Sequence, residues 1–181
     1  MIERLLNKYG IKQVGYYVED MGKSAQYFHD LLGAGPFVDM GESSPAKMIY
    51  NGDPNATMRV RCCLGNLGDM QMELIQVVSD GPTVYSDLGH YGLHHLCFFS
   101  DDPEQVEQDF AEAGIGIAMQ QVSGQGLKVT YYDARKELGS FIEVYAPNES
   151  LYAAVKALAD NADENTPALV SLEVLLKNMG R

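Results

Sequence analysis

Hydrophobic and polar positions along the chain change period several times, and these changes outline a series of strands and helices. Residues 11–18 are rich in β-branched and aromatic side chains, which predicts a strand. Residues 23–32 carry apolar side chains at helical spacing. Asp20 precedes this segment as a helix N-cap, and Gly33 ends it. The chain is therefore expected to begin its fold with a strand followed by a helix.

The next segment predicts a long loop and then a pair of strands. Residues 36–56 are rich in Gly, Ser, Pro, Asn and Asp, which favours a loop with one short strand at residues 47–50. Residues 58–64 and 70–77 are predominantly apolar and predict two strands. Residues 65–69 carry two glycines and are expected to form the turn between them.

The same order of elements returns in the second half of the chain. After a linker at 79–92, residues 93–99 predict a strand. Asp102 followed by Pro103 is typical of a helix start, and the helix is expected over residues 104–113. Three more strands are expected at residues 115–120, 126–133 and 140–145. The chain from residue 150 onward has apolar positions at helical spacing and predicts a helical tail.

The repeat is also visible in individual residues. The segments that start at Gln13 and His95 align, because each opens an apolar strand with a side chain that can bind a metal and closes on an acidic helix cap. The strands that contain Glu73 and Glu143 align as well, and each places one carboxylate among apolar residues. This repeat predicts an α+β fold of two tandem βαβββ modules that form a cup-shaped mixed sheet, with a C-terminal helical extension.

Gln13, Glu73, His95 and Glu143 are the candidate metal ligands at the centre of this cup. A carboxylate inside an apolar strand is costly to bury unless it is paired or bound to a metal. Taken singly, each would be interpreted as solvent-facing or as an ordinary core residue, but equivalent positions in a repeat favour a shared site. If the modules pack about a pseudo-twofold axis, the four side chains converge. Their oxygen-rich donors suit one divalent metal ion, which could be Zn, Ni, Co, Mn or Fe.

Composition and charge exclude several classes of function. The chain has 181 residues and a formal net charge of −12, which argues against binding to nucleic acids or to anionic membranes. No signal peptide is expected at the start of the sequence, and no apolar run approaches the length of a membrane span. The three cysteines are an odd number without a CxxC motif, which favours a reduced, cytoplasmic location.

The repeat, the segment LHHLCFF at residues 93–99 and the segment GSFIE at residues 139–143 resemble the vicinal oxygen chelate superfamily. This superfamily includes glyoxalase I, methylmalonyl-CoA epimerase, extradiol dioxygenases and bleomycin-resistance proteins. The resemblance covers about residues 11–146. The local sequence is most similar to the epimerases, where the first two ligands are usually His and Gln. The order Gln13, Glu73, His95, Glu143 is instead similar to that of animal-type glyoxalase I.

The resemblance implies a single glyoxalase-like domain that spans the whole chain. It implies a small-molecule substrate and a homodimer, with the cup formed either within one chain or across two. The expected parts are an N-terminal cap at 1–10, a first module at 11–78, a linker at 79–92, a second module at 93–146 and a helical tail at 147–181.

The reaction that the resemblance implies is a proton shift next to a carbonyl group, as in an epimerase or isomerase, with Glu143 or Glu73 as the base. A glyoxalase I-type lactoylglutathione lyase is an alternative that the ligand order favours, although Tyr17 stands where that enzyme has Arg. An extradiol-type dioxygenase, which needs two histidines and one carboxylate on iron, fits less well. A non-catalytic binding protein of the bleomycin-resistance type would generally lack these ligands.

Several neighbouring residues have expected positions relative to the site. His94 is expected on the opposite strand face from His95, packed or supporting rather than ligating. Four residues share strand faces with the ligands and are expected to line the cup: Tyr17, Cys97, Phe99 and Tyr145. Arg59 and Arg61 could meet an anionic substrate group or lie on a solvated face. The tail is expected to pack on its own domain or on a partner subunit.

Overall fold

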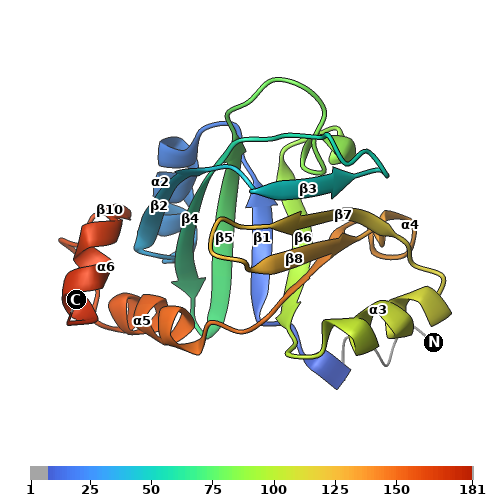
Figure 1. The fold of residues 1–181 in the computed structure, drawn as a ribbon. Helices are drawn as coiled ribbons and strands as arrows, with labels where there is room; N and C mark the ends of the chain where they lie inside the picture. The colour runs from blue at the N-terminus through green and yellow to red at the C-terminus, as the bar shows by residue number, and fades with distance from the viewer. Residues whose placement is uncertain (1–7, 181) are drawn as a thin grey trace.

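The computed structural model describes residues 8–180, so the N-terminal cap expected at residues 1–10 lies mostly outside the described residues. Ten strands form one sheet in the order β10-β2-β4-β5-β1-β6-β9-β8-β7-β3 (Figure 1). The strands are β1 (Gln13–Tyr17), β2 (Phe37–Ser43), β3 (Lys47–Tyr50), β4 (Val60–Leu67), β5 (Met70–Val77), β6 (Gly92–Phe99), β7 (Ile117–Val122), β8 (Lys128–Tyr132), β9 (Phe141–Tyr145) and β10 (Leu169–Ser171). The helices are α2 (Met21–Leu32), α3 (Pro103–Glu112), α4 (Arg135–Leu138), α5 (Glu149–Asp160) and α6 (Leu172–Asn178), with a 3-10 turn η1 (Ser86–Leu88).

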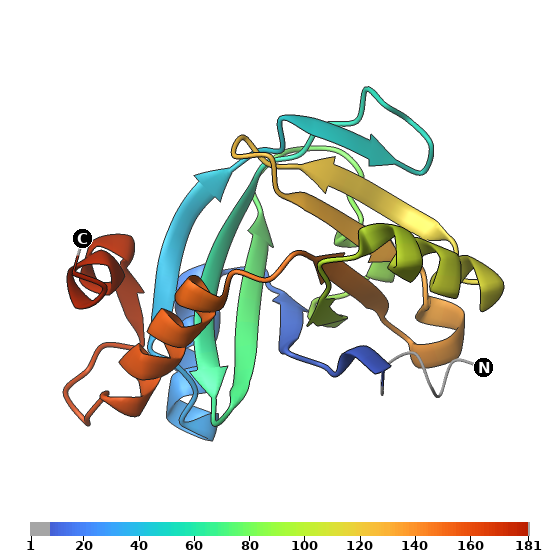
Figure 2. The ribbon, with the colours of Figure 1, turned by 60° about the horizontal axis from the view of Figure 1, so that its bottom comes forward.

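The sheet is built from two halves with the same internal order. The first half runs β2-β4-β5-β1 and the second runs β7-β8-β9-β6, each with its first strand parallel to its last. Strands β1 and β6 lie antiparallel at the centre and join the halves. Figure 2 shows the halves inclined to one another, so that the sheet curls into a cup. The expected α+β fold of two βαβββ modules in a mixed sheet is confirmed.

The helices α2 and α3 cover the outer face of the sheet. Every second side chain of each strand points to this face. From α2, Met21 and Ala25 are buried against a cluster that includes Leu74 of β5. From α3, Val106 and Phe110 are buried against the second half of the sheet. The alternate residues of the same strands, among them the two strand glutamates, therefore face the inside of the cup.

The helix ends follow the capping chemistry expected from the sequence. The Asp20 carboxylate accepts a hydrogen bond from the backbone N–H of Lys23 at 2.9 Å, at the start of α2. The Asp102 carboxylate accepts one from Gln105 at 3.0 Å, at the start of α3. Gly33 ends α2 with a φ of 67°, a left-handed conformation that glycine adopts without strain. These caps fix the residues at which α2 and α3 begin and the residue at which α2 ends.

The segment 36–56 contains more structure than its composition indicated. The short strand at 47–50 is present as β3, but β2 was missed because its polar residues were taken for loop. Asp39 of β2 is held by Arg61 of the adjacent strand, and the register of β2 against β4 shifts between Asp39 and Gly41. Strand β3 does not pair with its own half but crosses to β7 of the second half. That long-range pairing leaves no local signal in the sequence.

The C-terminal tail packs on the described part of the same chain. Val155 and Leu158 of α5 and Leu175 of α6 are buried with Val38 and Leu64 of the first half of the sheet. The tail also adds β10, a three-residue strand parallel to β2, which was not expected from its helical spacing. Among residues 8–180, no helix is both long and apolar enough to cross a membrane.

Candidate metal centre

The central strands β1, β5, β6 and β9 place three of the candidate ligands close together. Glu73 of β5 and His95 of β6 are both in register with Gly15 of β1, on its two sides. His95 Nε2 lies 3.4 Å from Glu73 Oε2 and 3.2 Å from Glu143 Oε2. A nitrogen and two carboxylate oxygens thus lie within 4.8 Å of one another. The two modules bring together residues that are distant in the sequence.

The donor atoms at this point lack the partners that buried polar atoms normally have. Among the described residues, the unpaired buried side-chain atoms include Glu73 Oε2, His95 Nε2 and Glu143 Oε2. The amide oxygen of Gln13 on β1 is also buried and unpaired, because its Nε2 donates to Gln71 Oε1 at 2.8 Å and leaves the oxygen free. Buried polar atoms without partners are rare and indicate an unfilled coordination or hydrogen-bonding need. Glu73, His95 and Glu143 therefore form a group that could hold a divalent cation, and the free oxygen of Gln13 is the candidate fourth ligand.

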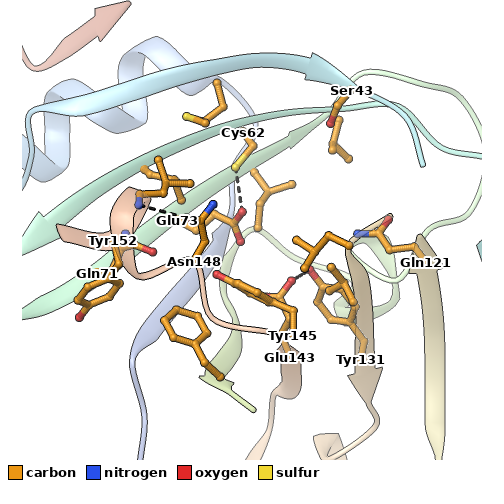
Figure 3. A pocket seen from close by; sticks show the side chains of 18 of the residues that line it. Ser43, Cys62, Gln71, Glu73, Gln121, Tyr131, Glu143, Tyr145, Asn148 and Tyr152 are labelled. Atoms are coloured by element: carbon orange, nitrogen blue, oxygen red, sulfur yellow. Dashed lines mark hydrogen bonds between the residues drawn. The ribbon is translucent and has the colours of Figure 1, made fainter. Parts of the chain in front are cut away.

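The remaining oxygen of each carboxylate is held by a hydrogen bond. The Tyr131 hydroxyl donates a short hydrogen bond to Glu143 Oε1. The Cys62 thiol donates to Glu73 Oε1 at 2.8 Å (Figure 3). A tyrosine hydroxyl is a stronger donor than a thiol. Glu143 is therefore held more firmly than Glu73, which is also the more exposed of the two.

His94 holds the His95 ring in the orientation that a metal requires. His94 Nε2 lies 3.0 Å from the Val84 carbonyl oxygen, which can only accept, so this nitrogen carries the proton. His94 Nδ1 must then accept from the N–H at His95 Nδ1, at 3.0 Å. The lone pair of neutral His95 is therefore on Nε2, which faces the carboxylates. Such partners fix the tautomer of metal-binding histidines.

The position of His94 differs from the expected one. Strict alternation would place it on the face opposite His95, but the pairing register of β6 against β1 shifts between Gly15 and Tyr16, and His94 is the extra residue. A β-bulge of this kind interrupts alternation and redirects a side chain. The ring of His94 consequently lies edge-on to that of His95, with 5.3 Å between ring centroids. Its expected supporting role is retained, with a contact that alternation did not predict.

We expect the change His94→Phe to weaken metal affinity by about 10- to 100-fold. Phenylalanine keeps the stacking that His94 makes with Phe141, at 4.9 Å between ring centroids, but cannot accept the hydrogen bond from His95. The measurement is a metal titration by isothermal calorimetry. His90→Phe in the exposed linker is the matched control, and equal affinity in the two variants would contradict this role for His94.

Burial and the two carboxylates set the charge of the metal-free site. Burial lowers the pKa of His95, but the carboxylates of Glu143 and Glu73 outweigh it and raise this pKa to about 9. Burial raises the pKa of Glu143, yet His95 and Tyr131 together bring it below its ordinary value. Burial also keeps His94 neutral, with its pKa lowered to about 3. In the metal-free protein at pH 7, His95 is therefore a cation between two carboxylates.

Metal binding is therefore expected to release a proton. Below pH 9 the metal must displace the proton on His95 Nε2, so metal affinity should rise by about tenfold per pH unit up to that pH and then level off. Calorimetry at pH 7 in buffers of different ionisation enthalpy counts the released protons. The expected number is about one. Release of no proton, with affinity independent of pH between 6 and 8, would contradict this arrangement.

Gly15 on β1 makes room for the His95 ring. A Cβ atom at position 15 would lie 2.0 Å from His95 Cε1 and 2.2 Å from His95 Nε2, much closer than carbon atoms can approach. The backbone of Gly15 is not in the left-handed region, so the need for glycine here is steric. Sequence reasoning missed this residue, because a glycine inside a strand indicates a close approach without naming what approaches.

Glu73 and Glu143 line a cavity of about 280 Å³ inside the cup. In Figure 3, Cys62 and Glu73 reach into it from one side, and Tyr131, Glu143 and Tyr145 from the other. Other lining residues come from β2, β4, β5, β6, β7, β8 and α5, and include Met40, Val60, Leu64, Ile75, Phe99, Gln121, Val129, Leu151 and Tyr152. The carboxylates thus lie at one end of a chamber with mostly apolar walls.

The expected lining residues are partly in place. Phe99 and Tyr145 line the cavity, whereas Tyr17 packs on Tyr85 and Tyr91, and Cys97 is fully buried and does not line the cavity. Two groups were missed, Tyr131 and Tyr85 from the protein interior and Leu151 and Tyr152 from α5. Tyr131 alternates with Thr130 and Tyr132 along β8, so its side was open to either interpretation. The position of α5 depends on tertiary packing.

A family comparison agrees with the two-module fold described above. The sequence profile described as the Glyoxalase/Bleomycin resistance protein/Dioxygenase superfamily matches residues 12–131, which include three of the four candidate ligands. No curated protein matches the sequence.

Several solved structures share the fold at low identity. Methylmalonyl-CoA epimerase from Mycobacterium tuberculosis is 17% identical with a TM-score of 0.52, over 80% of this chain and 91% of that one. A hypothetical protein from Bacillus halodurans C-125 is 17% identical with a TM-score of 0.54, over 77% and 94%. A methylmalonyl-CoA epimerase in complex with methylmalonyl-CoA and NH4+ is 15% identical with a TM-score of 0.51, over 78% and 96%. The protein belongs to the glyoxalase/bleomycin resistance protein/dioxygenase superfamily.

Proposed function

We propose that the protein is a divalent-metal-dependent enzyme that binds a small oxygenated substrate and moves a proton next to its carbonyl group, as an epimerase or isomerase does. One observation carries the proposal: the ligand atoms of Glu73, His95 and Glu143 have no hydrogen-bond partner among the described residues, converge within 4.8 Å and adjoin a cavity. In the metal-free protein the proton on His95 lies between the two carboxylates, where a divalent cation would replace it. The epimerases that share the fold are consistent with this class of reaction.

Gln13, Glu73, His95 and Glu143 would hold the ion. When bound, a divalent metal would polarise a substrate carbonyl and stabilise the negative charge that develops on its oxygen. Two carboxylates would balance the charge of the ion, and His95 is held with its lone pair directed into the site by His94. The metal could be Zn, Ni, Co, Mn or Fe, because these donors are acceptable to each.

Of the two glutamates, Glu73 is the better candidate to move the proton. Among residues 8–180, its only side-chain hydrogen bond comes from the Cys62 thiol, a weak donor, so the carboxylate can turn toward a substrate at little cost. Glu143 is fixed by Tyr131 and lies deeper. Its firm position suits a permanent ligand that keeps the site in place. A carboxylate next to the bound substrate can take a proton from one face of the carbon, and epimerisation is completed when a proton is delivered to the opposite face.

A lyase of the glyoxalase I type is the second candidate function, because the set Gln13, Glu73, His95 and Glu143 is similar to the ligands of that enzyme. It would use the same carboxylates for the same kind of proton transfer. The organisation expected from the sequence remains part of the proposal: one domain, acting as a homodimer in the cytoplasm.

The test is exchange of carbon-bound hydrogen with solvent. Protein reconstituted with each metal is incubated in D2O with 2-hydroxyacetophenone or with methylmalonyl-CoA, and loss of the proton next to the carbonyl is followed by NMR. Exchange that depends on both protein and metal is the expected result. Exchange no faster than with metal-free protein, for both compounds and all five metals, would refute the proposal. A glutathione hemithioacetal assay separates the lyase.

A further inference from the structure

The cavity beside the glutamates has walls without positive charge among the described residues. Among the described residues that line it, the charged side chains are Glu73 and Glu143, and there is no lysine or arginine. Five of its lining residues are aromatic and seven more are apolar: Phe99, Tyr85, Tyr131, Tyr145 and Tyr152, with Met40, Val60, Leu64, Ile75, Leu127, Val129 and Leu151. The neutral polar residues Ser43, Cys62, Gln71, Gln121 and Asn148 complete the lining beside the two glutamates. These walls offer dispersion and aromatic contacts and no counter-charge to an anion.

Arg59 and Arg61, which lie on or next to strand β4, point away from this cavity. Along β4, Cys62 and Leu64 face the cavity, so alternation places Arg61 on the other side. There its guanidinium is bound by Asp39 at 2.5 Å. Arg59 is paired with Glu42 at 3.3 Å. The expectation that these arginines could meet an anionic group of the substrate is therefore not met, because their charges are used on the opposite face.

The polar groups of the lining tyrosines are also largely engaged. Tyr85 and Tyr131 share a hydrogen bond of 3.0 Å, and Tyr131 donates to Glu143. The Tyr152 hydroxyl donates to the backbone oxygen of Asp69 at 3.0 Å. These rings consequently present faces and edges rather than free hydroxyls to a ligand. Among the described lining residues an anionic group would find only neutral polar partners such as Ser43, Gln121 and Asn148, and no positive charge to offset the loss of its water, which is unfavourable.

The volume of the cavity limits the size of the substrate. A cavity of about 150 Å³ holds a benzene molecule, and this one has about 280 Å³. It can hold a single ring with a short oxygenated side chain. A coenzyme A or glutathione conjugate would leave most of its polar and charged atoms outside, against a surface of a chain with a net charge of −12. Neither part of such a conjugate meets complementary charge in the described residues that line this chamber.

We propose that the substrate is a small, uncharged and largely apolar molecule, of about one ring in size, with its oxygen atoms at one end. The apolar part lies among the aromatic and aliphatic walls, and the oxygens lie at the end that carries Glu73 and Glu143. The way these oxygens are held rests on the proposed function. The selection for an uncharged, apolar body rests on the cavity walls alone.

Binding of matched probes tests the selection. 2-Hydroxyacetophenone and its para-carboxylate differ by one charged group at the end remote from the oxygens. Calorimetry on zinc-loaded and on metal-free protein is expected to give at least about tenfold tighter binding for the uncharged probe, in whichever form binds it. Equal or tighter binding of the carboxylate, or of methylmalonyl-CoA, would overturn the selection. No binding of the uncharged probe to either form would overturn it as well.

A charge placed at the rim should reverse the preference. Leu127 lines the cavity and is 37% exposed, so Leu127→Arg adds a cation without burying it. We expect this variant to bind the carboxylate probe at least about tenfold more tightly than the wild type does. Leu138→Arg, at a position of 41% exposure outside the cavity, is the control and should change nothing. Hydrogen exchange is scored separately: binding with the expected selectivity but without exchange refutes the proposed function and leaves this inference standing.

Discussion

Replacing Glu73 with glutamine is expected to lower hydrogen exchange on the substrate by about 10²- to 10⁴-fold while a metal still binds. Glutamine keeps an oxygen that can ligate and nearly the same shape, but its amide cannot accept a proton at neutral pH. Metal affinity should fall because one negative charge is lost, so the assay is run with saturating metal. The measurement is the exchange rate by NMR beside metal content by elemental analysis.

The control for this variant is Glu164→Gln, on an exposed loop, which should exchange hydrogen at the wild-type rate. Glu143→Gln makes a useful contrast. It replaces the carboxylate that Tyr131 holds, so we expect the larger loss of metal affinity there. If Glu73→Gln turned over at the wild-type rate with metal bound, Glu73 would not be the base.

Placing a methyl group at Gly15 is expected to disrupt the centre, because Gly15 lies on β1 between Glu73 of β5 and His95 of β6. The new Cβ would overlap the His95 ring, and this ring is confined by His94, Glu73 and Glu143 and cannot move away freely. Overpacking of a buried site costs about 1–3 kcal/mol of folding stability. We therefore expect Gly15→Ala to lower the thermal midpoint and to lose the metal, although no ligand has been changed.

The matched control is Gly116→Ala, where an added Cβ meets no atom within 4 Å and the backbone is not left-handed. Thermal unfolding and metal content are measured for both variants. Normal metal content and stability in Gly15→Ala would mean that His95 does not lie where the structure places it. Equal losses in both variants would mean that the effect at Gly15 is not specific to the His95 ring.

Much of the architecture could be predicted because the sequence contains two copies of the same module. The alignment of Gln13 with His95, and of Glu73 with Glu143, follows from two modules of like order. The helix starts were also predictable, since Asp20 and Asp102 cap through local hydrogen bonds. Local chemistry and internal repetition are the two signals that a single sequence carries well.

The features that could not be predicted depend on contacts between distant segments. Strand β3 pairs with β7, and α5 brings Tyr152 to the cavity; neither choice is visible in local sequence. The position of His94 needed a bulge, and bulges break the period on which strand predictions rest. The charge selectivity of the cavity was equally hidden, because Arg61 could have faced either side of β4.

Elemental analysis tests whether Gln13, Glu73, His95 and Glu143 form a metal site. Wild-type protein is purified after exposure to zinc, nickel, cobalt, manganese or iron, beside His95→Ala and Glu143→Ala, and each is also checked for folding by circular dichroism. The account predicts about one metal ion per wild-type chain and loss of the metal in both folded variants. Wild-type protein without metal after every supply, or variants that retain it, would contradict the account.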